Sequence, residues 1–191
     1  MFLDGLEDAY EEGRAMGTFA QETANDYQMT REEMDEYSIE SLRRANAAID
    51  SGAFADEVVP VTFSTRKGEV TVEHDEQPGK GRPDKIPQLR PAFAKDGTIT
   101  AATSSSISDG AAAVVLSRES VAKANGQQPV AKIVAMAAHA QEPAQFTVAP
   151  IGAIEKVLDK AGWSADEVEL WEVNEAFACV AMFAMRDIGI P

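Results

Sequence analysis

Near the end of the 191-residue chain, one stretch joins a predicted strand directly to a predicted helix: Val168-Glu-Leu-Trp-Glu-Val-Asn-Glu-Ala-Phe-Ala178. Its first six residues are rich in types that favour strands. Asn174 is a residue type favoured at helix N-caps, and apolar residues recur at helical spacing after it as far as Gly189. We therefore predict a strand over 168–173 and a helix that Asn174 caps.

The same alternation of strand and helix extends upstream of this stretch. Strand-like runs occupy residues 98–103, 111–116 and 130–138, and helical patterns occupy residues 120–125 and 151–161, with a second capping box at 164–167. Strands that alternate with helices predict an α/β fold. Because parallel strands need neighbours on both sides, we expect the chain to carry an incomplete portion of that fold.

The first part of the chain has a different pattern, which predicts a small α+β unit over residues 1–88. Thr30-Arg-Glu-Glu33 has the form of a capping box and precedes about five turns of an amphipathic helix that ends at Gly52. Two β-rich runs, 58–64 and 69–74, are joined by Thr65-Arg-Lys-Gly68. We expect a hairpin there, with Gly68 at a position that needs a positive φ.

The charge is strongly uneven along the chain. The whole sequence has a net charge of −15, and residues 1–76 hold 19 acidic and 6 basic side chains. Residues 77–95, by contrast, hold five basic side chains and one acidic one, together with several prolines and glycines that predict an irregular loop. This basic segment is either a solvated linker or a landing site for an anionic ligand.

Composition also excludes several classes of protein. A single cysteine, Cys179, and two histidines, His74 and His139, allow no intramolecular disulfide and no Cys/His zinc cluster within one chain. The acidic balance disfavours nucleic acid as the main partner, and no apolar run is long enough to cross a membrane. We therefore expect a soluble, cytoplasmic protein with no metal site.

Four motifs, taken in their order, resemble the middle of a thiolase. They are Asp4-Gly-Leu6 with Met16-Gly17, Leu89-Arg-Pro-Ala-Phe93 leading to Gly97-Thr-Ile-Thr-Ala101, Ser108-Asp-Gly-Ala-Ala-Ala113, and Trp171-Glu-Val-Asn-Glu-Ala-Phe-Ala178. The resemblance implies the layered α-β-α-β-α thiolase fold. It also implies three parts: a loop domain for tetramerisation and coenzyme A binding (1–88), the end of the N-terminal thiolase domain (89–126) and the start of the C-terminal domain (127–191).

The resemblance further implies an acyltransferase reaction. Thiolases carry out reversible Claisen condensation and thiolysis of 3-ketoacyl-CoA thioesters through a cysteine acyl-enzyme, with coenzyme A as substrate rather than a permanently bound cofactor. Residues 146–150 and 171–173 look closer to the mitochondrial type of acetoacetyl-CoA thiolase than to long-chain degradative enzymes, which favours short substrates. Homo-oligomers, either dimers or tetramers, are implied for the complete protein.

The same resemblance assigns the candidate site residues. Asn174 matches the asparagine that holds the oxyanion-hole water, and its amide can donate N–H without titrating. Glu175 either positions this loop or is a carboxylate that is solvated or that complements the dipole at the helix N-terminus. The coenzyme A contacts implied are Ser105 for the pantetheine arm, Phe93 and Phe146 for the apolar tunnel, and Lys80 with Arg82 for the phosphates.

Three groups that thiolases need have no match in the sequence: the nucleophilic cysteine, the histidine of a Gly-His-Pro motif and the second cysteine. Cys179 lies in an apolar helical run, so we expect a buried structural thiol. His74 and His139 match no catalytic residue and have no evident partner. We therefore expect the isolated chain to be inactive as a thiolase. The alternatives are a non-catalytic thiolase-like binding or assembly module and an acidic regulatory domain.

Overall fold

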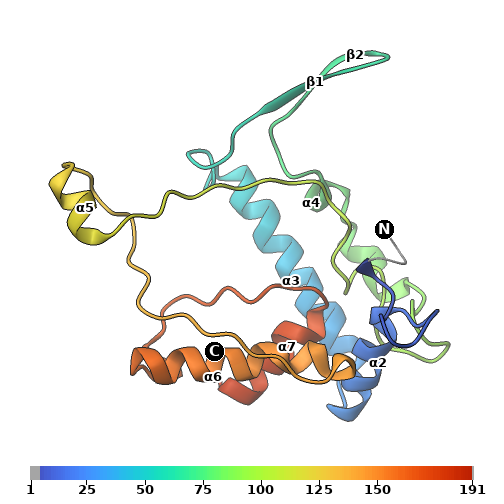
Figure 1. Ribbon diagram of the computed structural model, residues 1–191. Coiled ribbons are helices and arrows are strands. Elements are labelled where there is room, and N and C mark those ends of the chain that lie inside the picture. The colour runs from blue at the N-terminus through green and yellow to red at the C-terminus, as the bar shows by residue number, and fades with distance from the viewer. Residues whose placement is uncertain (1–4, 191) are drawn as a thin grey trace. The chain divides into compact units, whose positions relative to one another are not determined.

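The computed structural model describes residues 5–190, and these residues form two compact units (Figure 1). The first unit extends to Ser106 and also includes Asn174–Ala181. The second unit comprises Ile107–Val173 and the residues from Met182 onward.

Two helices build the core of the first unit. Helix α2 spans Met16–Asp26 and helix α3 spans Arg31–Asp50. The capping box predicted at the start of α3 is confirmed, because Thr30 accepts a hydrogen bond from the Glu33 backbone and the Glu33 side chain accepts one from the Thr30 backbone. The apolar side chains buried in this unit include Phe19, Ala20, Ala24, Met29, Met34, Ile86 and Ile99.

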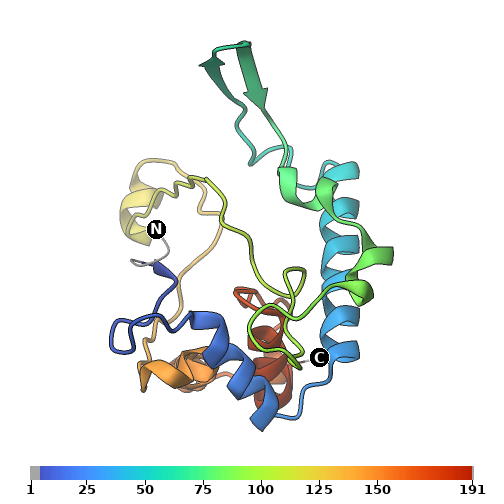
Figure 2. The same cartoon turned by 90° about the vertical axis from the view of Figure 1, so that its right-hand side faces the viewer.

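The predicted hairpin is also confirmed. Strands β1 (Val61–Thr65) and β2 (Gly68–Val72) pair antiparallel, with Val61 opposite Val72. Gly68 has a φ of 120°, which residues with a Cβ rarely adopt. Figures 1 and 2 both show the hairpin standing away from α3 and from the short helix α4 (Glu76–Lys80).

The basic segment is more regular than the sequence predicted. Most of α4 and the 3₁₀ helix η1 (Pro83–Gln88) lie within it, and both pack on α3. Asp75 caps α4 by accepting a hydrogen bond from the Gln77 backbone, and Pro83 occupies the first position of η1. Proline suits the first turn of a helix because its φ is already helical, so the prolines here start a turn where the composition predicted an irregular loop.

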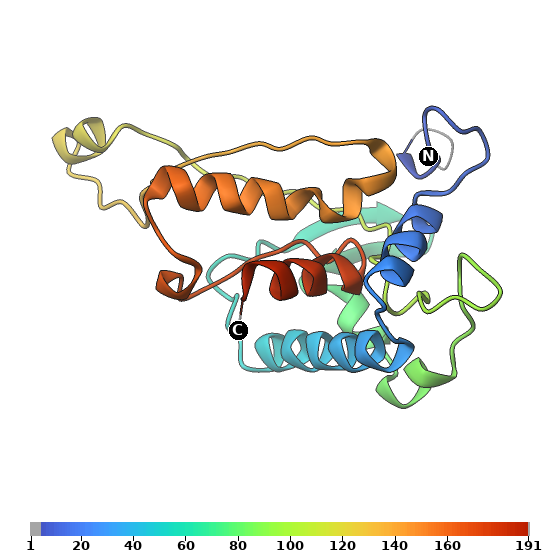
Figure 3. The same cartoon turned by 90° about the horizontal axis from the view of Figure 1, so that it is seen from below.

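The second unit consists of short helices joined by extended chain. Its helices are α5 (Glu119–Ala124), η2 (Pro143–Val148), α6 (Ala149–Ala161) and η3 (Ala165–Glu167), while α7 (Ala178–Ile188) is shared by both units. The predicted helix stop at Gly162 is confirmed by its left-handed φ of 70°. Figure 3 shows α6 lying beside the extended segment that precedes it.

The strands predicted at 98–103, 111–116, 130–138 and 168–173 are wrong as sheet strands. Within residues 5–190 the only sheet is the β1–β2 hairpin. Residues 98–103 instead form a turn in which the Thr103 hydroxyl accepts a hydrogen bond from the Thr100 backbone, because short hydroxyl side chains compete with ladder bonding. The other three segments are extended but have no neighbouring strand among the described residues, and a strand exists only through its partner.

No helix among the described residues is both long enough and apolar enough to cross a membrane. Across the same residues, no group of three or more His, Cys, Asp or Glu side chains is arranged to hold a metal ion.

Candidate functional site

The loop before α7 is fixed to the turn that contains Ser105, within the first unit. Ser104 and Phe177 form an isolated antiparallel bridge, and the Ser105 N–H donates to the carbonyl of Ala176 at 3.0 Å. Two predicted site residues, Ser105 and Asn174, are therefore brought to the same loop pair, although they lie far apart in the sequence.

Glu175 anchors the same loop to helix α3. The Tyr37 hydroxyl donates to one oxygen of Glu175 at 2.9 Å, and the Ser41 hydroxyl donates to the other oxygen at 2.8 Å. Tyr37 and Ser41 lie four residues apart and hence on one face of the helix. Of the two roles weighed for Glu175, these contacts favour the positioning of the loop over that of a solvated carboxylate.

Asn174 does not cap a helix, so that prediction is wrong. Helix α7 begins at Ala178, because the bridge at Phe177 and the hydrogen bond to Ala176 hold the preceding residues in a non-helical conformation. Asn174 is exposed, and its side-chain amide has no hydrogen bond to another residue in the described part of the chain. Its two N–H donors are thus available to a ligand or a water molecule.

Phe93 supports the loop before α7 through packing of its ring against Phe177. Its ring meets Phe177 edge-on, with the centroids 5.9 Å apart and the planes at 81°, a favourable aromatic geometry. On its other side the ring lies over Gly17 of α2, where an added Cβ would be 2.2 Å from the nearest ring carbon. Glycine is therefore required at position 17 for Phe93 to lie where it does.

Gln21 is a buried residue that connects α2 to residues 98 and 99 by hydrogen bonds, and no sequence motif identified it. It is 3% exposed, and its amide oxygen accepts hydrogen bonds from the backbone N–H groups of Thr98 and Ile99 at 2.9 and 3.0 Å. Its amide nitrogen donates to Asn25 and to the Thr98 hydroxyl. The available signal was a glutamine among the apolar positions of α2, since buried polar side chains are nearly always hydrogen-bonded.

The two predicted phosphate ligands flank a glycine that rests on α3. An added Cβ at Gly81 would come within 2.5 Å of Leu42, next to Ser41 in the sequence. Lys80 and Arg82 are both exposed, and neither has a carboxylate partner among residues 5–190; Arg82 donates to the Gly81 carbonyl at 2.9 Å. Helix α3 therefore contacts both the loop that contains Asn174, through Glu175, and the segment that carries these two cations, through Gly81.

A further contact fixes the basic segment to the start of α3. The Arg31 guanidinium pairs with Asp35 at 2.7 Å and donates to the carbonyls of Ile86 and Leu89 at 3.0 Å each. Asp35 is buried, and a buried carboxylate is stable there only with such a partner.

Phe146 lies in η2, in the second unit, and is half-buried. Its predicted role toward coenzyme A stays a prediction. Nearby, His139 has partners, which corrects the expectation that it had none. The Lys156 ammonium donates to its Nδ1 at 2.9 Å, and its Nε2 faces Gln141 at 2.9 Å. Because an ammonium cannot accept a hydrogen bond, Nδ1 is the acceptor and Nε2 carries the proton.

His139 acquires these partners because α6 runs back along the segment that contains it. An added Cβ at Gly152 would come within 2.7 Å of the His139 ring, and Lys156 follows one helical turn later. The other histidine, His74, is exposed.

Cys179 is a buried thiol, as expected. It is fully buried in the first turn of α7, and burial raises its pKa to about 12. Loss of hydration disfavours the thiolate, which is the form that acts as a nucleophile. Cys179 is therefore a protonated packing residue at neutral pH.

Comparison with known proteins places both parts of the sequence in one family. Residues 1–120 match the family model described as "Thiolase, N-terminal domain", and residues 127–191 match "Thiolase, C-terminal domain". An acetyl-CoA acetyltransferase of Yarrowia lipolytica is 47% identical over 187 residues, which is 98% of this chain and 47% of that protein. The chain thus spans about half the length of the curated relatives that it matches.

Solved structures give the same result for the fold. The crystal structure of Bacillus anthracis acetyl-CoA acetyltransferase superposes with a TM-score of 0.93 at 37% identity, covering 99% of this chain and 48% of that one. That of the Ascaris suum Acat5 thiolase in complex with coenzyme A gives 0.90 at 41% identity, covering 98% and 48%. The predicted α/β, thiolase-like fold class is therefore confirmed.

Proposed function

Because the chain belongs to the thiolase family, we propose that it forms part of an acyltransferase that acts on short 3-ketoacyl-CoA thioesters, acetoacetyl-CoA above all. The reaction is the reversible Claisen condensation and thiolysis through a cysteine acyl-enzyme. The observation that carries the proposal is the Asn174 loop, which is fixed on both sides, while the Asn174 side-chain amide has no hydrogen-bond partner among residues 5–190.

The proposed role of Asn174 is to hold the oxyanion-hole water. Enolate and tetrahedral intermediates place negative charge on the thioester oxygen, and donors that are already in position stabilise this charge without reorganising. The bonds from Ser105 to Ala176 and from α3 to Glu175 supply such rigidity.

The proposed coenzyme A contacts are made by the candidate residues that the sequence motifs identified. Ser105 would meet the pantetheine arm, and Phe93 would lie beside the apolar part of the ligand. The contact with coenzyme A proposed for Phe146, in the second unit, is a separate proposal. Lys80 and Arg82 would meet the phosphates, lysine as a point charge and arginine as a planar donor. Their exposure and their lack of a described carboxylate partner support this role.

We also propose that this chain is inactive by itself. Its sequence contains no Gly-His-Pro motif, and its one cysteine is the buried Cys179. In the family, the nucleophile and its two acid–base partners belong to stretches that have no match here. A cytoplasmic location and a homo-oligomeric parent are further proposals.

The first experiment measures coenzyme A binding to the 191-residue chain by calorimetry. We expect Lys80→Glu with Arg82→Glu to weaken binding at least tenfold, because each reversal replaces an attraction for phosphate with a repulsion. Lys132→Glu is the matched control: Lys132 is also exposed but lies in the second unit. Equal losses in the control and in the double variant would remove the phosphate-site assignment.

The second experiment tests the reaction in a chimaera that joins this chain to the remaining parts of the Yarrowia lipolytica relative. Asn174→Ala is expected to lower kcat for acetoacetyl-CoA cleavage by about 10²–10³, the usual cost of losing one oxyanion-hole donor. A chimaera that folds and binds coenzyme A without cleaving acetoacetyl-CoA would favour the non-catalytic module. Cleavage by the isolated chain, abolished by Cys179→Ser, would overturn the proposed inactivity.

A further inference from the structure

One lysine of the second unit has an imidazole as its partner. The Lys156 ammonium donates a hydrogen bond to Nδ1 of His139 at 2.9 Å, and Nε2 of the same ring lies 2.9 Å from the amide oxygen of Gln141. Lys156 is exposed, and His139 is half-buried. Lys156 is the only lysine among residues 5–190 that donates to a histidine ring.

The packing of the ring against helix α6 fixes this pair. An added Cβ at Gly152 would lie 2.7 Å from Cε1 and Nδ1 of His139, so the ring lies directly against the helix backbone. Lys156 follows Gly152 by four residues and hence lies on the same face of α6. Because the Gln141 oxygen accepts the Nε2 proton, the lone pair of Nδ1 is left for Lys156.

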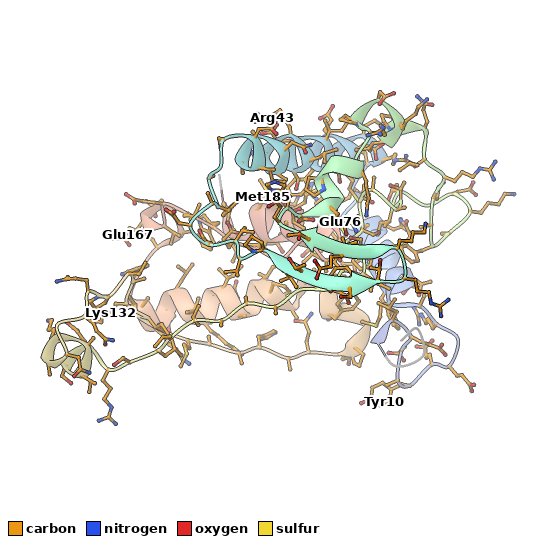
Figure 4. All side chains as sticks on the ribbon, turned by 90° about the horizontal axis from the view of Figure 1, so that it is seen from above. Tyr10, Arg43, Glu76, Lys132, Glu167 and Met185 are labelled. Atoms are coloured by element: carbon orange, nitrogen blue, oxygen red, sulfur yellow. The ribbon has the colours of Figure 1, made fainter. Side chains whose placement is uncertain are left out.

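The other lysines of the second unit, all of them exposed, provide a comparison within the same chain. Lys160, one turn further along α6, donates to the backbone carbonyl of Met136 at 3.0 Å, and Lys123 pairs with Glu119. Lys132, labelled in Figure 4, has no hydrogen-bond partner among the described residues. Of these partners only the imidazole is the usual general base at neutral pH.

The partner decides how readily the amine can react. A lysine attacks a carbonyl carbon as the neutral amine, because an ammonium has no free electron pair. An imidazole that already accepts the N–H bond is in position to take the proton as the attack begins. The Gln141 oxygen then stabilises the imidazolium, because Nε2–H of His139 donates to it.

We propose that Lys156 is an acyl-accepting lysine, with His139 as its general base and an acyl-CoA thioester as the acyl donor. The donor class rests on the proposed function, but the reaction uses none of the residues proposed for thiolysis. It modifies the chain itself at a site in the second unit.

The step balances without an oxidant or a reductant. Nδ1 of His139 takes one proton from Nζ of Lys156, and the nitrogen lone pair attacks the thioester carbonyl carbon. The N–C bond forms and the C–S bond breaks. The leaving sulfur takes a second proton from Nζ, and His139 releases its proton to water. The products are an amide on Lys156, a free thiol and one proton.

The first test measures the acetylation of each lysine in the 191-residue chain. The chain is incubated with acetyl-CoA or, in parallel, with the acetyl thioester of N-acetylcysteamine, which carries no nucleotide. Digestion at glutamate and tandem mass spectrometry give the rate at each lysine. With both donors, Lys156 should react about tenfold faster than Lys160 and Lys132. This is less than the 10²–10⁴ of a base in an enzyme active site, because Lys156 is exposed.

Two variants test whether the imidazole is the cause. His139→Asn keeps an oxygen near the position of Nδ1 that accepts a hydrogen bond but does not take the proton, so Lys156 should slow to the rate of Lys160. Gly152→Ala keeps the histidine but displaces its ring, and it should slow Lys156 as well, while alanine favours the helix. The rates at Lys160 and Lys132 should stay unchanged in both variants, which controls for loss of the fold.

The two donors separate this proposal from the proposed function. Selective reaction of Lys156 with the small thioester supports the proposal even if the chain does not bind coenzyme A. Equal rates at Lys156, Lys160 and Lys132 with both donors would overturn it. Selectivity that appears only with acetyl-CoA and survives His139→Asn would overturn it as well, because the coenzyme rather than the imidazole would then select the lysine.

Discussion

Cys179 shows how one residue type can mislead in a family with cysteine chemistry. The thiol follows directly on a family motif, yet it is fully buried among apolar side chains in α7. Burial raises its pKa to about 12. Since the reactive form is the thiolate, this position favours packing over nucleophilic attack.

The expected consequence is low thiol reactivity in the folded chain. From pH 7 to 9 the solution lies well below the raised pKa, so Cys179 stays protonated and should react with a disulfide reagent far more slowly than a free thiol of pKa about 8.5. Reaction should become fast after denaturation. The control is Ala47→Cys in a Cys179→Ala background, because position 47 is exposed on α3. Equal rates for the two folded proteins would contradict the burial argument.

Helix α3 organises the candidate site as an element. It holds Glu175 through Tyr37 and Ser41, supports Gly81 through Leu42, and fixes η1 and Leu89 after it through Arg31. The capping box at its start sets where its turns begin, and hence which side chains face the loop and the basic segment.

Removing either hydroxyl should loosen the Asn174 loop. Tyr37→Phe and Ser41→Ala each delete one exposed hydrogen bond to Glu175, worth roughly 0.5–1 kcal/mol, so amide exchange at Ser105 and Ala178 should rise about two- to fivefold. On a Glu175→Ala background neither substitution should have a further effect. Tyr10→Phe is the control, because Tyr10 is exposed elsewhere. Additive effects with Glu175→Ala would mean that the hydroxyls act through other contacts.

Local signals in the sequence predicted local structure well. The capping boxes, the hairpin with Gly68 and the helix stop at Gly162 each depend on residues within one or two turns of each other, and all are confirmed. The predicted strands failed because a strand is defined by a partner elsewhere. The alternation of strand and helix still indicated the correct fold class, which the solved relatives confirm.

The candidate site was predictable only in part, for the same reason. Family motifs identify Asn174, Ser105 and Phe93 as candidates, and the structure brings these residues to one loop pair and its support. The contacts of Glu175 come from residues 138 and 134 positions away, so no local pattern could reveal them. The helix that Asn174 was expected to cap starts later, because pairing with residues 103–105 overrides its capping propensity.

On the scale of the whole chain, the two units bury their apolar residues to different extents. The first unit buries Phe19, Met34 and Ile99 almost completely. In the second unit, large apolar side chains of the extended segments are open to solvent: Val114, Val115, Leu116, Val130, Ile133, Val134, Met136 and Leu170. Extended apolar chain with unpaired backbone groups is the usual template for association.

This difference predicts two regions of unequal stability. In the 191-residue chain, amides of α2 and α3 should be strongly protected from exchange, while those of 111–116, 130–138 and 168–173 should exchange quickly, because they lack a described ladder partner. The exposed segments should also bind the hydrophobic dye ANS. Protection of these segments equal to that of α3 would contradict the open arrangement.

Substitutions of exposed and of buried residues can show whether the extended segments are open to solvent or packed. Val115 and Val130 are 96% and 105% exposed, so Val115→Ser with Val130→Ser should reduce dye binding and aggregation while changing the free energy of unfolding by no more than about 0.5 kcal/mol each. Phe183→Ser removes a fully buried ring from α7 and should cost about 3–5 kcal/mol. If the exposed pair proved as costly as Phe183→Ser, the two valines would have to be packed in solution, and these segments would be a second core rather than an open surface.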